Sequence, residues 1–309
     1  MTMSRLKSGQ GRCVRTVDEA SDLRLADLPD RREMDALLMC EPTYFEVRDE
    51  KNPFMAGNVG SVNRKEAYRQ WQALKRRFEE LNFPIDVLPG EPELEDMVFA
   101  ANQVLVGEDA DGQRYVVPAR MRHRSRQNEV PYYRRWFVAH GYRILELPED
   151  EGGPVYFEGH GDAIWHPGKR LIWGGWGQRS ELRAHVLLAE LLDLPVIALN
   201  LPNPKFYHLD TAFCPLDVES AAVFPGAFDQ AGMALIRRYF GNLIEVSESE
   251  AFNFACNALA LGRKVIIERG SKEVCRRLRE LRFEPCEVET GEFMKSGGSV
   301  FCLKSQHYR

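Results

Sequence analysis

Short apolar runs and amphipathic stretches alternate along this chain. Residues 36–40 (ALLMC) form a continuous apolar run shortly before Pro42, which is typical of a buried strand. Between Arg64 and Phe83, apolar residues recur at spacings of three and four and so describe one face of a helix. The pattern therefore predicts a strand, then a helix, and then a second strand that begins at Ile85.

Pairs of short apolar runs follow, and each pair is joined by a polar or glycine-containing turn. Residues 104–106 and 115–117 flank the turn DADG at 109–112, which predicts a β-hairpin. A fifth copy of this arrangement starts at Gly297 and ends in Cys302. The intervening pairs lie at 163–165 with 171–173, at 211–216 with 221–224, and at 257–261 with 265–267. Helix-like stretches occupy 131–140, 181–192, 227–239 and 272–281.

Five polar-headed hairpins with helices between them make a weak internal repeat of roughly 40 to 60 residues. Such a repeat favours one closed α/β domain of radial modules, whose leading polar residues lie near a common centre. An ordinary α+β arrangement stays open, because such proteins also look repetitive. We expect residues 34–309 to form a single domain. Residues 1–33 are charged throughout and lack aromatics, which predicts a flexible or surface-docked extension.

Composition and charge narrow the class of partner. The chain has 309 residues, of which 44% are hydrophobic, and this suffices for a substantial core. A net charge of −5 gives no general reason to bind nucleic acid or an anionic membrane, so a small-molecule partner is expected. No apolar run approaches the ~20 residues that span a bilayer, and no secretory signal is evident. We expect a cytoplasmic protein, and a homo-oligomer stays open.

The cysteines introduce candidate chemistry. Seven cysteines are spread over the chain without a CxxC pair, which fits neither a disulfide framework nor a zinc site, so reduced thiols are expected. A thiol nucleophile needs a neighbouring base or cation, and a histidine whose second ring nitrogen meets a carboxylate can transfer its proton. Cys302, His208 and Glu158, which lead or end their modules beside polar residues and glycines, would form such a unit.

Two aspartates accompany this set. A planar guanidinium is best held by carboxylates that accept its N–H donors in a fork, and Asp162 and Asp210 are the candidates. Each residue also has an ordinary structural interpretation: Cys302 as a small buried side chain, His208 as a hydrogen-bonded core histidine, and the aspartates as turn caps. A metal site with His160 is not favoured, because HExxH and paired-histidine spacings are absent.

Four motifs together resemble the guanidino-modifying, or pentein, superfamily. They are FEGHGDA at 157–163, FYHLDTAFCPL at 206–216, FACNAL at 254–259 and GGSVFCL at 297–303. That group includes arginine deiminases, dimethylarginine dimethylaminohydrolases and amidinotransferases. The likeness is strongest to the arginine dihydrolase module of cyanobacteria, through LLMCEPTYFEV, NPFMAGN, DMVFAANQ and GWGQRSE.

The resemblance implies a fold and a site. It implies a five-bladed, pseudo-symmetric α/β propeller without metal or organic cofactor, in which residues 34–309 are one guanidino-modifying catalytic domain. Cys302 would be the nucleophile, His208 the general acid and base, and Glu158 the carboxylate that engages the substrate or the histidine. Arg120 and Arg179 would hold the substrate α-carboxylate, because arginine makes bidentate contacts. Asn52 and Asn102 would line the pocket.

One departure within the resemblance is informative. Arginine deiminases carry Asp where this chain has Asn102. An amide can donate as well as accept, so Asn102 could bind a neutral ureido group whose carbonyl oxygen a carboxylate would repel. The hypothesis is that citrulline stays bound and reacts again, which makes the enzyme an arginine dihydrolase that yields ornithine, CO2 and ammonia. Dimethylarginine dimethylaminohydrolase or arginine deiminase activity is the alternative, followed by amidino transfer or a non-catalytic binding protein.

Overall fold

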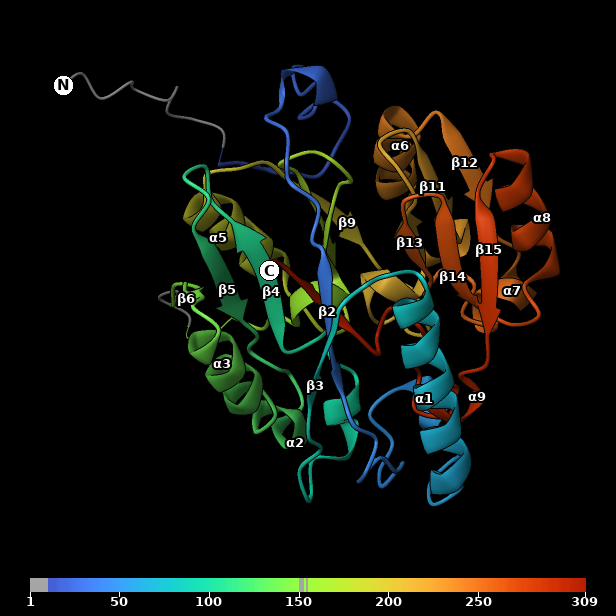
Figure 1. Ribbon diagram of the computed structural model, residues 1–309. Coiled ribbons are helices and arrows are strands. Elements are labelled where there is room, and N and C mark those ends of the chain that lie inside the picture. The colour runs from blue at the N-terminus through green and yellow to red at the C-terminus, as the bar shows by residue number, and fades with distance from the viewer. Residues whose placement is uncertain (1–10, 150–152, 154) are drawn as a thin grey trace.

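Five small sheets make up the protein. The computed structural model describes residues 11–149, 153 and 155–309. Within them, each sheet combines an antiparallel strand pair with a third strand that runs parallel to the second. The long helices lie on the outside of the five sheets (Figure 1). The predicted five-bladed α/β propeller is therefore confirmed.

One module shows how the sequence produces the repeating unit. The strand β4 (Val104–Glu108) pairs antiparallel with β5 (Arg114–Pro118), as predicted. The helix α3 (Val130–Ala139) then carries the chain back, so that β6 (Arg143–Ile144) runs parallel to β5. A parallel partner needs such a crossover, whereas the antiparallel pair needs only a tight turn. Gly112 lies in that turn with φ +77°, which favours glycine.

Three further modules repeat this order without interruption. Their predicted hairpins and helices are confirmed, with small shifts at the ends. The second module comprises β7 (Ala163–Trp165), β8 (Ile172–Trp176), α5 (Leu182–Leu192) and β9 (Val196–Asn200). The third comprises β10 (Phe213–Pro215), β11 (Ser220–Val223), α6 (Gln230–Tyr239) and β12 (Asn242–Glu245). The fourth comprises β13 (Leu259–Leu261), β14 (Lys264–Glu268), α8 (Lys272–Glu280) and β15 (Glu284–Val288).

The fifth module joins the two ends of the domain. The predicted fifth hairpin after Gly297 is not local: the chain turns through Cys302 into β16 (Ser305–His307), which pairs antiparallel with β2 (Ala36–Cys40). The helix α1 (Arg64–Glu80) and the strand β3 (Ile85–Leu88) complete the module. The ring is therefore closed by strand pairing between residues far apart in sequence, which fixes the segment that carries Cys302.

Burial explains the sequence patterns of this module. All five residues of β2 are buried, so the strand reads as continuously apolar instead of alternating. In α1, Trp71, Leu74 and Phe78 form the buried stripe that the spacing predicts. Asn63 caps the start of the helix, because its side chain accepts a hydrogen bond from the amide of Glu66 and so satisfies a free N–H of the first turn.

Short elements fill the connections between modules. They are the helices α2 (Arg124–Gln127), α4 (Gly159–Asp162), α7 (Glu248–Phe252) and α9 (Gly291–Met294), and the 3-10 turns Leu25–Asp27, Pro53–Met55, Glu95–Val98, Leu209–Thr211 and Pro225–Ala227. All seven cysteines are free. No helix in the described part of the chain has the length and apolar character needed to cross a membrane.

The N-terminal segment decides between two expectations. The strand β1 (Cys13–Val14) pairs parallel with β9 and adds a fourth strand to the second module. Val14, Leu23 and Leu28 are buried, and the hydroxyl of Tyr239 donates to the carbonyl of Leu23 at 2.9 Å. Of the two alternatives, flexible or surface-docked, residues 11–33 therefore show the docked one, because their few apolar side chains pack against the core while the charged ones stay outside. Residues 1–10 lie outside the described residues.

Candidate active site

Three segments from different modules meet in the active site, and each lies directly before a strand or a short helical turn. Glu158 directly precedes α4, His208 directly precedes the turn Leu209–Thr211, and Cys302 lies just before β16. His208 Nε2 lies 2.7 Å from Glu158 Oε2, and both side chains are buried. Cys302 and His208 line the same small cavity. The structure thus brings together the three residues that the sequence proposes as a unit.

Glu158 is held as an anion that orients His208. Its Oε2 accepts from Arg179 Nη1 at 3.0 Å, and its Oε1 accepts from the backbone N–H of Arg122 at 3.0 Å. Burial alone would raise the pKa of Glu158, but the charges of Arg179 and His208 outweigh it and hold this pKa well below its usual value. A permanent carboxylate therefore fixes one ring nitrogen of His208 and leaves the other available for proton transfer.

The surroundings of Cys302 favour the neutral thiol. Its Sγ lies 3.1 Å from Asp210 Oδ2 and 3.2 Å from Asn257 Nδ2. Burial, together with the negative charge of Asp210, raises the pKa of Cys302 well above its usual value. Asn257 also accepts from the backbone N–H of Cys302 at 3.2 Å, so it positions the thiol. Sequence reasoning missed Asn257, although it lies inside the FACNAL motif.

The two aspartates occupy different positions. Asp162 uses both carboxylate oxygens inside the protein, because Oδ1 accepts from the amide of Leu209 at 3.0 Å and Oδ2 from Ser180 Oγ at 2.6 Å. Asp162 therefore positions the loop that follows His208. The expectation that Asp162 holds the substrate guanidinium is wrong, because both of its oxygens are already engaged. Asp210 lies against Cys302 instead, and its Oδ1 is buried without a hydrogen-bond partner among the described residues.

Only one of the two predicted arginines faces the cavity. Arg179 lines it, and its Nη2 donates to the carbonyl of Lys51 at 3.1 Å. The guanidinium of Arg120 points away from the cavity and donates to the carbonyls of Leu147 and Pro148. The prediction that Arg120 holds the substrate α-carboxylate is therefore wrong. The strand-like backbone bridge that Arg120 makes with Phe157 holds it away from the cavity.

Arg126, which the sequence analysis did not single out, lines the cavity where Arg120 does not. It is buried and is neutralised by Glu129 through an Nη2–Oε2 contact of 2.9 Å. Its Nη1 donates to Asn102 Oδ1 at 3.1 Å. The available signal was an arginine and a glutamate three residues apart, a spacing that is common for exposed ion pairs and so did not point to a site.

The two predicted asparagines also line the cavity but differ in what they offer. Asn52 is fully engaged, because Nδ2 donates to the carbonyl of Ser296 at 2.9 Å and Oδ1 accepts from the amide of Phe54 at 2.9 Å. Asn102 Nδ2 has no partner within the described chain. Since Arg126 can only donate, it fixes Oδ1 toward itself and leaves an N–H2 group for a ligand.

The cavity itself is small. Its volume is about 10 Å3, which is room for about one water molecule. This volume is smaller than an amino acid, so a substrate of that size needs a movement of residues that line the cavity. Among the described residues, no group of three or more His, Cys, Asp and Glu side chains is arranged to hold a metal ion.

Comparison with known proteins places this arrangement in a family. The family model described as "N,N dimethylarginine dimethylhydrolase, eukaryotic" matches residues 41–309. The bifunctional arginine dihydrolase/ornithine cyclodeaminase AgrE of Nostoc sp. is 38% identical over 268 residues, which are 86% of this chain and 37% of that protein. The chain thus spans little more than a third of that bifunctional relative.

Two further comparisons cover most of both partners. One is the crystal structure of the N-terminal domain of ArgZ, a cyanobacterial arginine dihydrolase, in which a cysteine is mutated and substrate is bound. It superposes on this chain with a TM-score of 0.83 at 36% identity, and the match covers 89% of this chain and 98% of that one. The N(G),N(G)-dimethylarginine dimethylaminohydrolase of Mycobacterium tuberculosis is 34% identical over 264 residues, 85% of this chain and 83% of that protein. This chain therefore belongs to the N,N-dimethylarginine dimethylhydrolase family.

Proposed function

We propose that this protein hydrolyses the guanidino group of arginine through a covalent bond to Cys302 and releases ornithine, CO2 and ammonia. The observation that carries the proposal is that His208, which is paired with the buried Glu158, lines one cavity together with Cys302 and the free amide donor of Asn102. The relatives support it, since AgrE and ArgZ are named arginine dihydrolases.

The substrate's own charge starts the first half-reaction. A guanidinium beside Cys302 meets the free Oδ1 of Asp210, which can accept one of its N–H donors. The positive charge also favours the thiolate, so binding lowers the high pKa of Cys302. The Cys302 thiol gives its proton to His208 as its sulfur attacks the guanidino carbon, and His208 passes this proton to the departing ammonia. An amidino-thioether links the substrate to the enzyme.

Water completes the cycle. His208, now deprotonated, takes a proton from water, which attacks the amidino carbon and expels the Cys302 thiolate. The product of this round is citrulline. A second round on the ureido carbon, with another water molecule, releases a second ammonia and then CO2 and ornithine. The reaction thus consumes two waters for each arginine.

Asn102 supports the second round. Citrulline is neutral, and its carbonyl oxygen needs a donor where arginine has an N–H group. The unpartnered Nδ2 of Asn102 offers that donor, and Arg126 holds the amide in this orientation. A carboxylate at the same position would repel the oxygen.

Hydrolysis of methylated arginine is the second candidate. It is favoured by the matching family and by the name of the mycobacterial relative. Feeding arginine, dimethylarginine and citrulline separately to the purified protein separates the candidates, with ornithine, citrulline, ammonia and dimethylamine as readouts. Ornithine from both arginine and citrulline is expected. If arginine goes to citrulline and stops, the dihydrolase proposal is wrong, and release of dimethylamine alone supports the second candidate.

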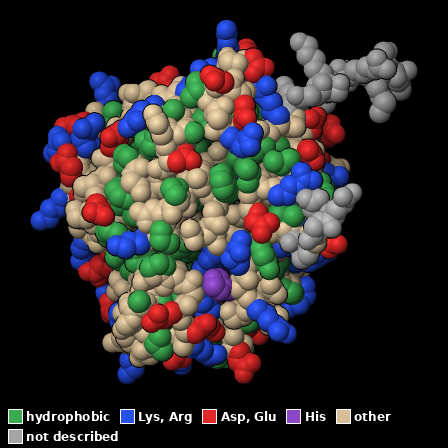
Figure 2. All heavy atoms as spheres, turned by 180° about the vertical axis from the view of Figure 1, so that it is seen from behind, with side chains coloured by type: hydrophobic (Ala, Val, Ile, Leu, Met, Phe, Trp, Pro, Cys, Tyr) green, Lys and Arg blue, Asp and Glu red, His purple; other side chains and the backbone are tan. Residues whose placement is uncertain are grey.

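Amidino transfer and a role without catalysis are further outcomes of the same assay. An amidinotransferase would need an added amine acceptor, and a binding protein would turn over none of the three compounds. A small-molecule partner agrees with the surface, since acidic and basic side chains are interspersed on the face that Figure 2 shows. The cytoplasmic location and the oligomeric state stay predictions.

A further inference from the structure

A glutamate lies buried at the end of β14, in the fourth module. Glu268 is the last residue of this strand, and only 6% of it is exposed to solvent. Among the described residues no cation forms an ion pair with it, and its neighbour Arg269 pairs with Glu289 instead. Burial of a carboxyl group without a cation costs free energy, so a residue that served packing alone would be apolar.

The carboxyl group of Glu268 is held by Thr290, which directly precedes α9. The backbone N–H of Thr290 donates to Glu268 Oε2 at 2.7 Å, and the Thr290 hydroxyl donates to the same oxygen. Strands β14 and β15 run parallel with Glu268 opposite Val288, so the chain reaches Thr290 at the edge where both strands end. Burial raises the pKa of Glu268 to about 7, and the two hydrogen bonds from Thr290 oppose this rise and favour the carboxylate.

The same hydroxyl reaches the segment that carries Cys302. Thr290 Oγ1 lies 2.6 Å from Ser299 Oγ, and both side chains are buried. Since the Thr290 hydroxyl gives its proton to Glu268, its oxygen is left as an acceptor, and the Ser299 hydroxyl donates to it. A chain of hydrogen bonds with one direction therefore runs from Ser299 through Thr290 to Glu268.

Asn257 connects the end of this chain to the thiol. Its Oδ1 accepts from the backbone N–H of Ser299 at 3.0 Å and from that of Cys302 at 3.2 Å. Its Nδ2 donates to the carbonyl of Asp210 at 3.0 Å and lies 3.2 Å from Cys302 Sγ. These four contacts use the full hydrogen-bonding capacity of the amide. A displacement of Ser299 therefore reaches Cys302 through an amide that holds both residues.

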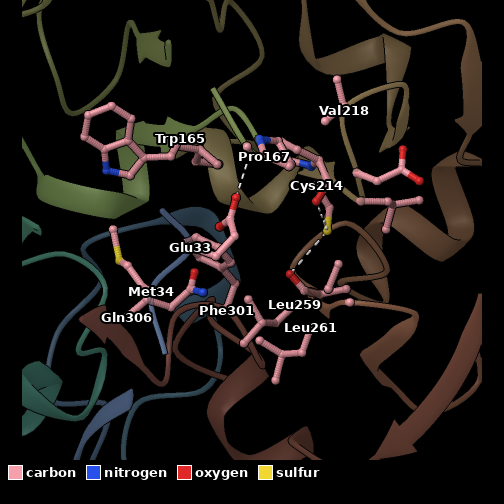
Figure 3. Close-up of a pocket in the computed structure, with 18 of the residues that line it drawn as sticks. Glu33, Met34, Trp165, Pro167, Cys214, Val218, Leu259, Leu261, Phe301 and Gln306 are labelled. Atoms are coloured by element: carbon pink, nitrogen blue, oxygen red, sulfur yellow. Dashed lines mark hydrogen bonds between the residues drawn. The ribbon is translucent and has the colours of Figure 1, made fainter. Parts of the chain in front are cut away.

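Packing alone does not hold this segment in place. Gly298 and Cys302 line the small cavity of the active site, whereas Phe301 lines a second cavity of about 450 Å3 (Figure 3). A segment that borders empty volume has fewer packing contacts, so hydrogen bonds supply more of its restraint. Glu268 and Thr290 line neither of these cavities, so they restrain the segment without touching a bound substrate.

We propose that Glu268 is a positioning residue that holds the Cys302 sulfur in place for attack, through the hydroxyls of Thr290 and Ser299. The inference rests on the proposed hydrolysis of a guanidino substrate. A misplacement of about 1 Å in a reacting group can cost about 100-fold in rate. Arg126 and Arg179, which face the same cavity, lie on other segments and keep their places. Loss of the hydrogen-bond chain should therefore lower kcat and leave KM nearly unchanged.

The kinetics of arginine hydrolysis in four variants test the proposal. Thr290→Val keeps the shape of the side chain but breaks the chain of hydrogen bonds, so kcat should fall about tenfold while KM changes less than about twofold. Thr290→Ser keeps the hydroxyl and should restore kcat to within about twofold of wild type. Glu268→Met removes the terminal acceptor and should lower kcat like Thr290→Val. Glu268→Gln keeps an acceptor oxygen and should stay near wild type.

A second readout and a control separate positioning from folding. Alkylation of Cys302 by chloroacetamidine should slow in Thr290→Val by about the same factor as kcat. Ser305→Ala is the matched control, since Ser305 lies buried three residues after Cys302 and its hydroxyl has no partner among the described residues. Its kcat and its alkylation rate should equal those of wild type. Melting temperatures show whether each variant is folded at the assay temperature.

Wild-type kcat in folded Thr290→Val or in folded Glu268→Met overturns the proposal. A raised KM at unchanged kcat also overturns it, because the segment would then serve binding, and so does a Thr290→Ser that is as slow as Thr290→Val. If Thr290→Val does not fold, Ser299→Ala, which cuts the chain at its other end, decides by the same criteria. Failure of the proposed function is distinct, because wild type would then turn over no guanidino compound, while the alkylation rates still compare the variants.

Discussion

Arg126 Nη1 donates to Asn102 Oδ1 across 3.1 Å, and both side chains are buried. The contact settles the orientation of the amide, because a guanidinium has no acceptor and can face only the oxygen. Asn102 Nδ2 is then left toward the cavity without a partner in the described chain. An arginine outside the reacting set thus determines what the pocket can recognise.

Asn102→Asp should therefore separate the two rounds of hydrolysis. A carboxylate next to Arg126 can still accept from a guanidinium, but it repels the carbonyl oxygen of citrulline. Loss of a donor in a buried site costs on the order of 2–3 kcal/mol, so citrulline turnover should fall by about 100-fold. Product analysis with arginine should show citrulline accumulating. Ornithine release at the wild-type rate would contradict the role of Asn102.

Cys302→Ser should abolish turnover while leaving arginine binding intact. An alcohol is far less acidic than a thiol, so the loss should be about 1000-fold or more. Chloroacetamidine, a reactive amidine, should label Cys302 in the wild type, and mass spectrometry locates the adduct. Cys286→Ser, which removes a partly exposed thiol in β15, is the matched control and should be labelled and active like wild type. Appreciable activity in Cys302→Ser would remove this residue from the mechanism.

The hairpins and helices of the modules could be predicted because each is formed by residues close together in the sequence. The hairpin β4–β5 and the helix α1 follow from spacing and turn residues that lie next to one another. The pairing of β16 with β2 could not be predicted this way, since it joins ends of the chain that share no local signal. The motif resemblance supplied the closed ring, and strand pairing confirms it.

Some residues of the site could likewise be predicted from the sequence, and others could not. Glu158, His208 and Cys302 each head or end a module, so the repeat itself suggested that they meet. Residues whose role depends on where the side chain points could not be predicted from the repeat. Arg120 points to backbone carbonyls, whereas Arg126 reaches the cavity, and the direction in which a single side chain points leaves no periodic signal in the sequence.

The Glu158–His208 pair should appear in the pH dependence of stability. The pKa of Glu158 is lowered by folding, so its contribution is present above the unfolded value of about 4.3 and is lost as pH falls through the folded value. Glu158→Gln should cost about 3 kcal/mol of unfolding free energy at pH 7, because Arg179 is left buried and unpaired. The difference from wild type should shrink below about pH 4.

Urea denaturation at pH 7 and at pH 3 measures this effect. Glu273→Gln is the matched control, since Glu273 also has a lowered pKa, through its hydrogen bond to Arg276, but lies on the surface. Solvent screens that pair, so little change is expected at either pH. An equal cost of Glu158→Gln at both pH values would show that the loss comes from packing and not from the charge.

Gly161 tests whether the site depends on close approach. A Cβ added there would lie 2.2 Å from Asn102 Nδ2 and 3.4 Å from His208 Cγ, so Gly161→Ala must displace the amide of Asn102. Citrulline turnover should then fall more than the first hydrolysis of arginine, because only the second round needs the Asn102 donor. Gly241→Ala, where an added Cβ meets nothing within 4 Å, is the control and should leave both rates unchanged. Equal losses of both rounds in Gly161→Ala would mean that His208, and not Asn102, is what the glycine protects.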